Sequence, residues 1–253
     1  MNAALRVETL KLAHSPVGAI GTLALLVGTL VLLGGLTVGL AGENPVLAAK
    51  ADFSGIAVTL DWSGLLALAA QITSAASLLG FGVVLAWMFA REFADGTVTG
   101  LFALPVTLGR IALAKFVVYA LWVMLVSLSL TLGLLGLGTV LGYGAPSPDV
   151  WAGLVRQTAL AMLSGALAVP VAWIATVTRS LLAAVGGVIA LVVVGQVGAI
   201  VGAGGWMPLV APALWAMSDG RAVTATQLTL TVAVALALVG LACATWSRLQ
   251  LDR

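Results

Sequence analysis

Six long apolar runs, separated by short polar segments, set the pattern of this chain. About 20 helical residues, rising 1.5 Å each, cross the roughly 30 Å of hydrocarbon in a bilayer. Because the bilayer interior offers no water to the backbone, each run must satisfy its own amide and carbonyl groups as a helix. The runs cover residues 17–40, 63–90, 111–141, 157–177, 181–203 and 228–246. The pattern therefore predicts an all-α integral membrane protein with six transmembrane helices.

The residues before the first span show a weaker, amphipathic pattern. Leu5 and Leu12 lie seven positions apart on one helical stripe, with Glu8 and Lys11 beside it. We expect an interfacial helix over residues 1–15 that lies on the membrane surface before the chain turns into the first span. Since the chain shows no internal repeat and no low-complexity linker, it is predicted to form a single transmembrane domain over residues 1–253.

Charge is scarce and unevenly distributed. Only 8% of the residues are charged, against about a quarter in a typical soluble domain, so lipid must cover much of the surface. Six spans put both termini on one side, and that side carries eight of the eleven Lys and Arg residues. Because positive residues concentrate on the inner side of membrane proteins, both termini are predicted to be cytoplasmic. This topology accounts for the net charge of +2 without a nucleic-acid partner.

Several kinds of chemistry lack the residues that they need. The chain has no G-x-x-x-x-G-K-[ST] motif and therefore no phosphate-binding loop for ATP. A single histidine, His14, excludes a His-rich metal or haem site. The middle of each span lacks the ionisable residue that ion-driven carriers keep there. We therefore expect a non-catalytic chain that holds no metal and no cofactor, and that takes energy for transport from another subunit.

The segment 91–115 departs from this pattern, because it gathers five of the twenty charged residues. Asp95 is placed to cap a helix of about two turns over residues 97–103, which Pro105 would end. The segment fits two interpretations. It is either an ordinary interfacial loop with snorkelling charges or a docking helix for a cytoplasmic partner.

The same segment resembles the loop after the second span in permeases of type-2 ATP-binding-cassette (ABC) transporters. The shared features are an acidic residue, Gly96-Thr97, an apolar run ending in Leu104-Pro105, then Arg110 and Lys115. The N-terminal ETLKLAHSP is similar to the start of these permeases, particularly the branch that includes bacitracin-resistance and lantibiotic-immunity permeases. In that family the segment is the cytoplasmic coupling helix, which seats in the ATPase. By resemblance, the residues that couple to the ATPase are Arg91, Glu92, Asp95, Gly96, Thr97, Leu101, Leu104, Pro105 and Arg110.

The resemblance implies the membrane-spanning permease subunit of an ATP-driven exporter in a bacterial cytoplasmic membrane. Two ABC ATPase subunits would bind ATP and Mg²⁺, and a second permease, identical or homologous, would complete the transporter. Glu92 would offer its charge to a basic groove on the ATPase. Spans with so little charge suit a drug-like, peptide or lipid-like substrate, as in multidrug or antibiotic resistance. The alternative is an ATP-independent carrier or a membrane scaffold without an ATPase partner.

Two further sets of residues are candidates for the pathway and for a dimer contact. Polar residues within spans suit either a substrate pathway or hydrogen bonds between helices. Small residues four positions apart allow close helix contact, and the resemblance places the first and fifth spans between two permeases. The pathway candidates are Gln71, Ser74, Ser77 and Gln196, and the dimer candidates are Gly35, Gly39, Gly198 and Gly202. The same glycines also fit packing within one subunit.

Overall fold

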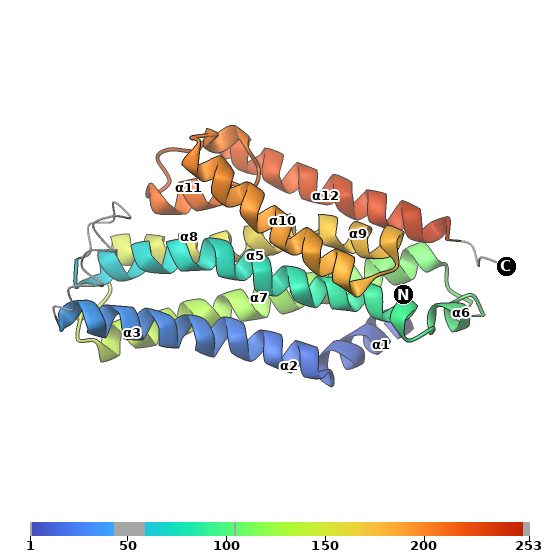
Figure 1. Ribbon diagram of the computed structural model, residues 1–253. Helices are drawn as coiled ribbons and strands as arrows, with labels where there is room; N and C mark the ends of the chain where they lie inside the picture. The colour runs from blue at the N-terminus through green and yellow to red at the C-terminus, as the bar shows by residue number, and fades with distance from the viewer. Residues whose placement is uncertain (1, 43–58, 104, 250–253) are drawn as a thin grey trace.

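Helices of membrane-spanning length lie side by side along one long axis (Figure 1). The structure is a computed structural model that describes residues 2–42, 59–103 and 105–249, and within these ranges all regular secondary structure is helical. Six segments are long and apolar enough to cross a bilayer. They are Pro16–Ala41, Trp62–Ala94, Leu108–Val140, Pro148–Thr178, Leu181–Ile200 and Ala225–Ser247. The prediction of an all-α membrane protein with six spans is confirmed.

Two of these spans contain more than one helical element. The first combines α2, the π-helical turn η1 and α3, and the fourth combines α8 and α9. Short elements connect the spans at both ends of the bundle. In chain order the elements are α1 (Asn2–Ala13), α2 (Pro16–Leu23), η1 (Ala24–Gly28), α3 (Thr29–Ala41), α5 (Trp62–Ala94), α6 (Val98–Leu101), α7 (Leu108–Val140), α8 (Pro148–Leu167), α9 (Pro170–Thr178), α10 (Leu181–Ile200), η2 (Gly204–Trp206), α11 (Ala211–Met217) and α12 (Ala225–Ser247).

The fourth span begins earlier than its apolar pattern predicted, at Pro148 rather than at residue 157. The Ser147 hydroxyl caps α8 by accepting a hydrogen bond from the Val150 amide. Pro148 follows at the first helical position, where its missing N–H costs no hydrogen bond. These start signals extend the helix upstream of the apolar run. Arg156 consequently lies inside α8, about 12 Å along the helix from its first residue.

The three spans in the middle of the chain form the centre of the bundle. In the most apolar windows of α5, α7 and the α8–α9 span, 56%, 56% and 61% of the residues are buried. The corresponding shares are 22% for the first span and 17% for both α10 and α12. Large apolar side chains on these outer helices are exposed, as with Leu182 and Ile200 at 83% each. The outer helices therefore offer surface to lipid or to another membrane helix.

The N-terminal helix α1 packs with its Glu8 and Lys11 side chains turned inward, whereas Arg6 is exposed. Glu8 and Leu12 are 4% and 5% exposed, whereas Val7 and Leu10 are 49% and 52% exposed. A helix that exposes apolar groups and buries a carboxylate is suited to the membrane surface, where lipid covers the apolar groups. Leu12 faces the protein. The inward direction of Glu8 was not anticipated.

The bundle has two distinct ends, or poles. Figure 1 shows α1, α6 and the C-terminal end of α12 at one pole, which we call the α6 pole. The first turns of α5 and α8 lie at the opposite pole, together with η2 and α11, and we call it the α11 pole. The two poles carry different sites.

Candidate functional site

The link between α5 and α7, together with the last turn of α5 and the first turn of α7, carries the predicted coupling residues and projects at the α6 pole (Figure 1). It begins after Ala94, turns at Gly96 with a left-handed φ of 67°, and then forms the short helix α6. Glycine adopts this backbone conformation without a steric penalty. Gly96, Thr99 and Phe102 are exposed. The link therefore presents a short helix at the joined ends of two long spans.

The helix in this link is shorter than predicted, and it is not capped by Asp95. It spans four residues instead of residues 97–103. Asp95 ends α5, and its Oδ2 atom lies 3.8 Å from the Arg91 Nε atom. Thr97 takes the N-cap position of α6, but its hydroxyl donates to Glu92 Oε2 at 2.6 Å. A helix of one turn is not stable alone, so α6 depends on these contacts with α5.

Four charged side chains meet at the base of the link. Glu8 and Lys11 come from α1, Glu92 from the end of α5, and Lys115 from the second turn of α7. Lys115 Nζ donates to Glu8 Oε2 and to Glu92 Oε1, both at 2.8 Å. Lys11 Nζ donates to Glu8 Oε1 at 2.9 Å and to Glu92 Oε1 at 2.8 Å. We call these four residues the buried charge cluster.

Most of the buried charge cluster is shielded from solvent. Glu92 and Lys115 are each 1% exposed, and Glu8 is 4% exposed. Charges removed from water persist when they are paired and hydrogen-bonded, and here two carboxylates balance two ammonium groups. Because Glu92 faces inward, the expectation that it offers charge to a basic groove on a partner is wrong. The cluster instead fixes α1 against α5 and α7.

Lys11 is the member of the cluster that lies nearest to solvent, with 26% of its side chain exposed. Burial lowers the pKa of Lys11, but its hydrogen bonds with Glu92 and Glu8 outweigh that effect and leave the pKa raised. Lys11 therefore stays protonated at neutral pH and keeps both hydrogen bonds.

Aromatic side chains enclose the cluster on the side of α12. Trp246 is fully buried, and Lys115 Nζ lies 5.9 Å from its ring centroid. Phe89 and Phe93 meet the Trp246 ring edge-on, with centroid separations of 5.5 and 6.1 Å. Trp246 Nε1 also donates to the Thr176 hydroxyl of α9 at 2.8 Å. The last span and α9 are thereby connected to the region around the cluster.

The sequence pattern did not identify Glu8 and Lys115 as partners. They are separated by 107 positions, so no local spacing could indicate their contact. One available signal was the presence of two acids and two lysines near the same predicted membrane face. Such residues are usually solvated, and only the packing of α1 across α5 and α7 shows that they pair.

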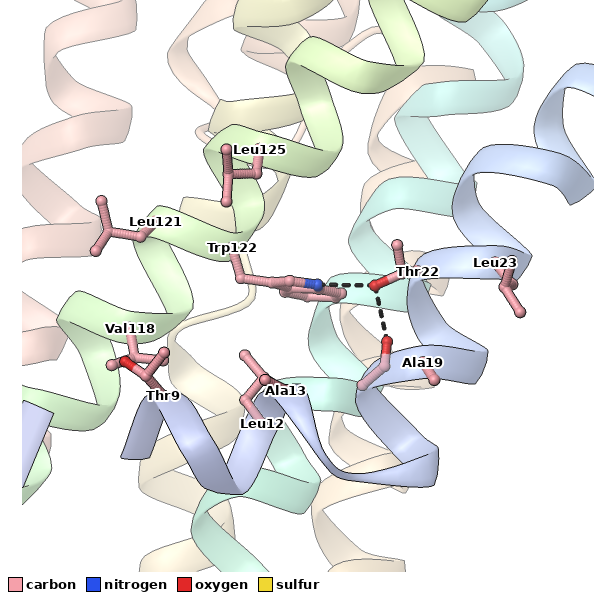
Figure 2. Close-up of a pocket in the computed structure, with 11 residues that line it drawn as sticks. Thr9, Leu12, Ala13, Ala19, Thr22, Leu23, Val118, Leu121, Trp122 and Leu125 are labelled. Atoms are coloured by element: carbon pink, nitrogen blue, oxygen red, sulfur yellow. Dashed lines mark hydrogen bonds between the residues drawn. The ribbon is translucent and has the colours of Figure 1, made fainter. Parts of the chain in front are cut away.

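An apolar pocket of about 500 Å³ lies between α1, α2 and α7. Figure 2 shows the Trp122 side chain pointing across it towards Thr22. Trp122 Nε1 donates to Thr22 Oγ1 at 2.9 Å, and Thr22 Oγ1 donates to the Gly18 carbonyl at 2.7 Å. With these polar groups satisfied, the remaining wall is hydrocarbon from residues such as Leu121 and Leu125. The pocket therefore suits an apolar chain or ring.

The predicted pathway residues occupy different environments. Gln71 and Gln196 are exposed, on α5 and α10 respectively, and Ser77 is buried. The Ser74 hydroxyl donates to the Gln71 carbonyl within the same helix. No hydrogen bond in the described part of the chain joins these four side chains to one another. Their assignment to a pathway stays a prediction.

A polar contact that the sequence analysis missed joins α5 to α8. Gln157 is 2% exposed, and its Nε2 atom donates to Thr73 Oγ1 at 2.6 Å and to the Ala69 carbonyl at 3.3 Å. Gln157 had been placed at the start of its span, where an amide is ordinary. Because α8 begins at Pro148, Gln157 lies deeper and pairs between helices.

The four candidate glycines do not share one surface. A Cβ atom at Gly35 would meet open space, which leaves this face of α3 free for a close contact. A Cβ atom at Gly198 would meet the Met207 side chain of the same chain, so Gly198 packs within this subunit, and its assignment to a dimer contact stays a prediction. Gly202 has a φ of 74° and forms the turn after α10. Gly39 is half-buried.

The remaining coupling candidates lie around α6. Leu101 is half-buried and packs against the core, whereas Pro105 and Arg110 are exposed. Leu104 lies outside the described residues. The structure thus places the described candidates along one continuous link, of which Glu92 alone is fully buried.

These features define a multi-pass helical membrane protein with an exposed connector at one pole. A family profile described as ABC-2 family transporter protein matches residues 4–197, which include α1, the buried charge cluster and the α5–α6–α7 link. The chain belongs to this family and is a type-2 ABC permease. Membership implies association with an ABC ATPase. A search of curated proteins finds no match.

Proposed function

We propose that this chain is the membrane subunit of an ATP-driven exporter, with α6 as the helix that contacts the ATPase. Two ATPase subunits would hold ATP and Mg²⁺, and a second permease, identical or homologous, would complete the transporter. Both termini and the α6 pole would face the cytoplasm of a bacterial cell. The observation that carries the proposal is an exposed connector between two central spans, inside the region that matches the ABC-2 family.

The buried charge cluster gives a physical route from α6 to the spans. Thr97 donates to Glu92, and Glu92 in turn accepts hydrogen bonds from Lys11 and Lys115. Separating one partner from a buried ion pair costs about 3–5 kcal/mol, because the other charge is left without compensation. A force applied to α6 would therefore move α1, α5 and α7 together rather than separate them.

The outer helices supply the surface that a second permease would need. The first span and α10 bury few of their own residues within this chain. Gly35 lies on an open face of α3, and Gly39 follows one turn later on the same helix. Small residues on such a face let two membrane helices approach closely. We place the second permease against this face of α3.

The proposed substrate is a drug-like, peptide or lipid-like molecule with an apolar portion. The pocket between α1, α2 and α7 has a volume typical of small-molecule sites and an almost entirely apolar lining. Its place beside the surface helix α1 would allow entry from the adjacent lipid leaflet. Substrates of bacitracin or lantibiotic type belong to this class.

Substitution of Phe102 by Asp tests the contact with the ATPase. Phe102 is 38% exposed on the link, so a carboxylate there is solvated and leaves the fold intact. Aromatic anchors contribute most at interfaces, and we expect at least a tenfold loss in the amount of ATPase that co-purifies. Substrate efflux from cells should fall in parallel.

Val140→Asp is the matched control, because Val140 is 84% exposed at the opposite end of α7. This variant should bind the ATPase normally. Normal ATPase binding and efflux in the Phe102 variant would exclude α6 as the contact. Failure of the unmodified protein to co-purify with any ATPase would favour an ATP-independent carrier or scaffold.

A further inference from the structure

A second cavity, of about 660 Å³, lies at the α11 pole between α5, α8 and α11. Its lining is mixed, unlike that of the pocket beside α1. The charged residues that line it are Asp149, Arg156, Asp219 and Arg221, and the uncharged polar ones include Thr59, Ser63 and Gln157. Apolar residues of α5 and α8, such as Leu66, Ala67 and Val150, form the rest of the wall.

Arg156 is the residue that requires an explanation. It lies about 12 Å along α8 from its first residue, within a helical segment long and apolar enough to cross a membrane, where charged residues are rare and usually functional. Its Nη2 atom donates to Asp219 Oδ1 at 2.7 Å. Its Nε atom is buried and has no hydrogen-bond partner among the described residues. A guanidinium carries five N–H donors, so Asp219 leaves most of this capacity unused.

The turn after α11 is built to hold Asp219 beside Arg156. Asp219 has a φ of 55° and Gly220 a φ of 84°, so two successive residues adopt left-handed backbone conformations. This conformation is uncommon for a residue with a side chain. Asp219 is nevertheless 69% exposed, so it shields Arg156 only in part. Arg221, also exposed, brings a second cation to the same cavity.

We propose that this cavity binds the phosphate of a phospholipid head group, with Arg156 as the principal ligand and Arg221 as the second. Arginine matches phosphate because its N–H groups can donate two parallel hydrogen bonds to phosphate oxygens. Thr59, just before α5, and Ser63, in its first turn, precede the apolar Leu66, so the lining changes from polar to apolar along the span. A phospholipid in the leaflet at this pole has the same order, with a polar head group followed by apolar chains.

The carboxylates in the cavity specify the kind of head group. Asp149, in the first turn of α8, has no ion-pair partner in the described part of the chain. It would repel a purely anionic ligand but would pair with an amine next to the phosphate. We therefore infer a preference for phosphatidylethanolamine over phosphatidylglycerol. The inference does not rest on the proposed export function, because it is argued from the cavity and the charged residues that line it.

Native mass spectrometry of the full-length protein, in the assembly in which it purifies, tests this site. The probes are phosphatidylethanolamine, phosphatidylglycerol, dioleoylglycerol, which lacks phosphate, and water-soluble phosphoethanolamine. Both phospholipids should bind, phosphatidylethanolamine more tightly. Arg156→Gln should weaken both at least tenfold. Asp219→Asn should preserve or strengthen binding, because it removes a negative charge that competes with phosphate for Arg156, and Asp149→Asn should abolish the preference for phosphatidylethanolamine.

Arg248→Gln, at the α6 pole, is the control and should leave binding unchanged. If Arg156→Gln and Asp219→Asn weaken binding equally, the two residues form only a structural ion pair and the proposal is wrong. Equal retention of dioleoylglycerol would identify nonspecific lipid contact and also overturn it. If phosphoethanolamine binds tightly and displaces the phospholipids, the ligand of the cavity is a soluble phosphate ester and not a lipid. Arg221→Gln, which leaves the Arg156–Asp219 pair intact, should weaken binding and tests the site even if Arg156→Gln does not fold.

Discussion

Lys115 shows how much a single residue can contribute when it is charged and almost completely buried. Its ammonium group contacts two carboxylates, and its side chain is 1% exposed. We expect Lys115→Met to destabilise the protein by about 3–5 kcal/mol, because Glu8 and Glu92 would then share the single cation of Lys11. Thermal or denaturant unfolding of the purified protein in detergent measures this loss.

A double variant separates charge balance from packing at the same position. Lys115→Met combined with Glu92→Gln removes one charge of each sign and leaves the Glu8–Lys11 pair. Because replacing a whole buried pair is far less costly than breaking it, the double variant should be more stable than Lys115→Met alone. A double variant no more stable than the single would contradict the charge-balance argument.

Asp61 allows a pH-dependent prediction outside the spans. Hydrogen bonds from the Thr59 hydroxyl, the Gly64 amide and the Ser63 hydroxyl lower the pKa of Asp61, which caps α5. Because folding lowers its pKa, the ionised Asp61 carboxylate stabilises the fold at pH values above its unfolded pKa of about 4. This stabilisation is lost as the pH falls through the folded pKa. Asp61→Ala should therefore cost about 1 kcal/mol at pH 7. Unfolding measured across pH should show this difference shrinking below about pH 4.

Among the elements, α6 shows what local sequence signals can and cannot determine. Pro105 correctly indicated that the short helix ends before it, and Gly96 forms the turn that precedes the helix. The predicted cap by Asp95 was wrong, because its side chain lies near Arg91 while Thr97 donates its hydroxyl to Glu92. Capping rules consider only the nearest residues. Here the tertiary position of the Glu92 carboxylate decides where the Thr97 hydroxyl points.

The break between α8 and α9 gives a prediction for one span. Pro170 has no N–H, so the helix turns through short 3₁₀-type hydrogen bonds from Ala168 to Gly165 and from Val169 to Ala166. The Tyr119 hydroxyl of α7 donates to the Gly165 carbonyl at 2.8 Å and helps to satisfy this break. Tyr119→Phe should cost about 1 kcal/mol and increase amide exchange around residue 168.

Tyr143→Phe serves as the control for this prediction. The Tyr143 hydroxyl has no hydrogen-bond partner within the described ranges, so its removal should change neither stability nor exchange. If the two tyrosine variants behave alike, the Tyr119 hydrogen bond contributes nothing to the break. Hydrogen–deuterium exchange on both variants in the same detergent provides the comparison.

For the whole molecule, cysteine labelling tests the proposed orientation. In a Cys243→Ala background, Ala145→Cys lies in the exposed turn before α8, and Thr99→Cys lies on α6. An impermeant thiol reagent added to intact cells should label the cysteine at position 145 and not that at position 99. The same reagent should label both sites in opened membranes. Labelling at position 99 in intact cells would place α6 outside and remove its access to an ATPase.

The sequence predicted some features of the overall architecture and not others. The lengths of the apolar runs predicted the six spans, because the ability of a segment to cross the membrane depends on its own residues. The central position of α5, α7 and α8 was not part of the prediction, because the windows differ little in mean hydropathy, from 1.8 in α5 to 2.3 in the first span, α10 and α12. Contacts between distant charges, such as Glu8 and Lys115, depend on that arrangement. Hydropathy measures preference for lipid, whereas burial within protein depends on which surfaces match.

The inward-facing charges of α1 also constrain the order of assembly. Ribosomes synthesise Glu8 and Lys11 before Glu92, and they synthesise Lys115 last. Until the segment around Lys115 has entered the membrane, docking of α1 would leave the Glu8 carboxylate without its buried cation. The N-terminal helix must therefore wait at the water boundary while the second and third spans insert. Its closure onto them is a late step in biogenesis, available only to chains whose third span has inserted in the correct register.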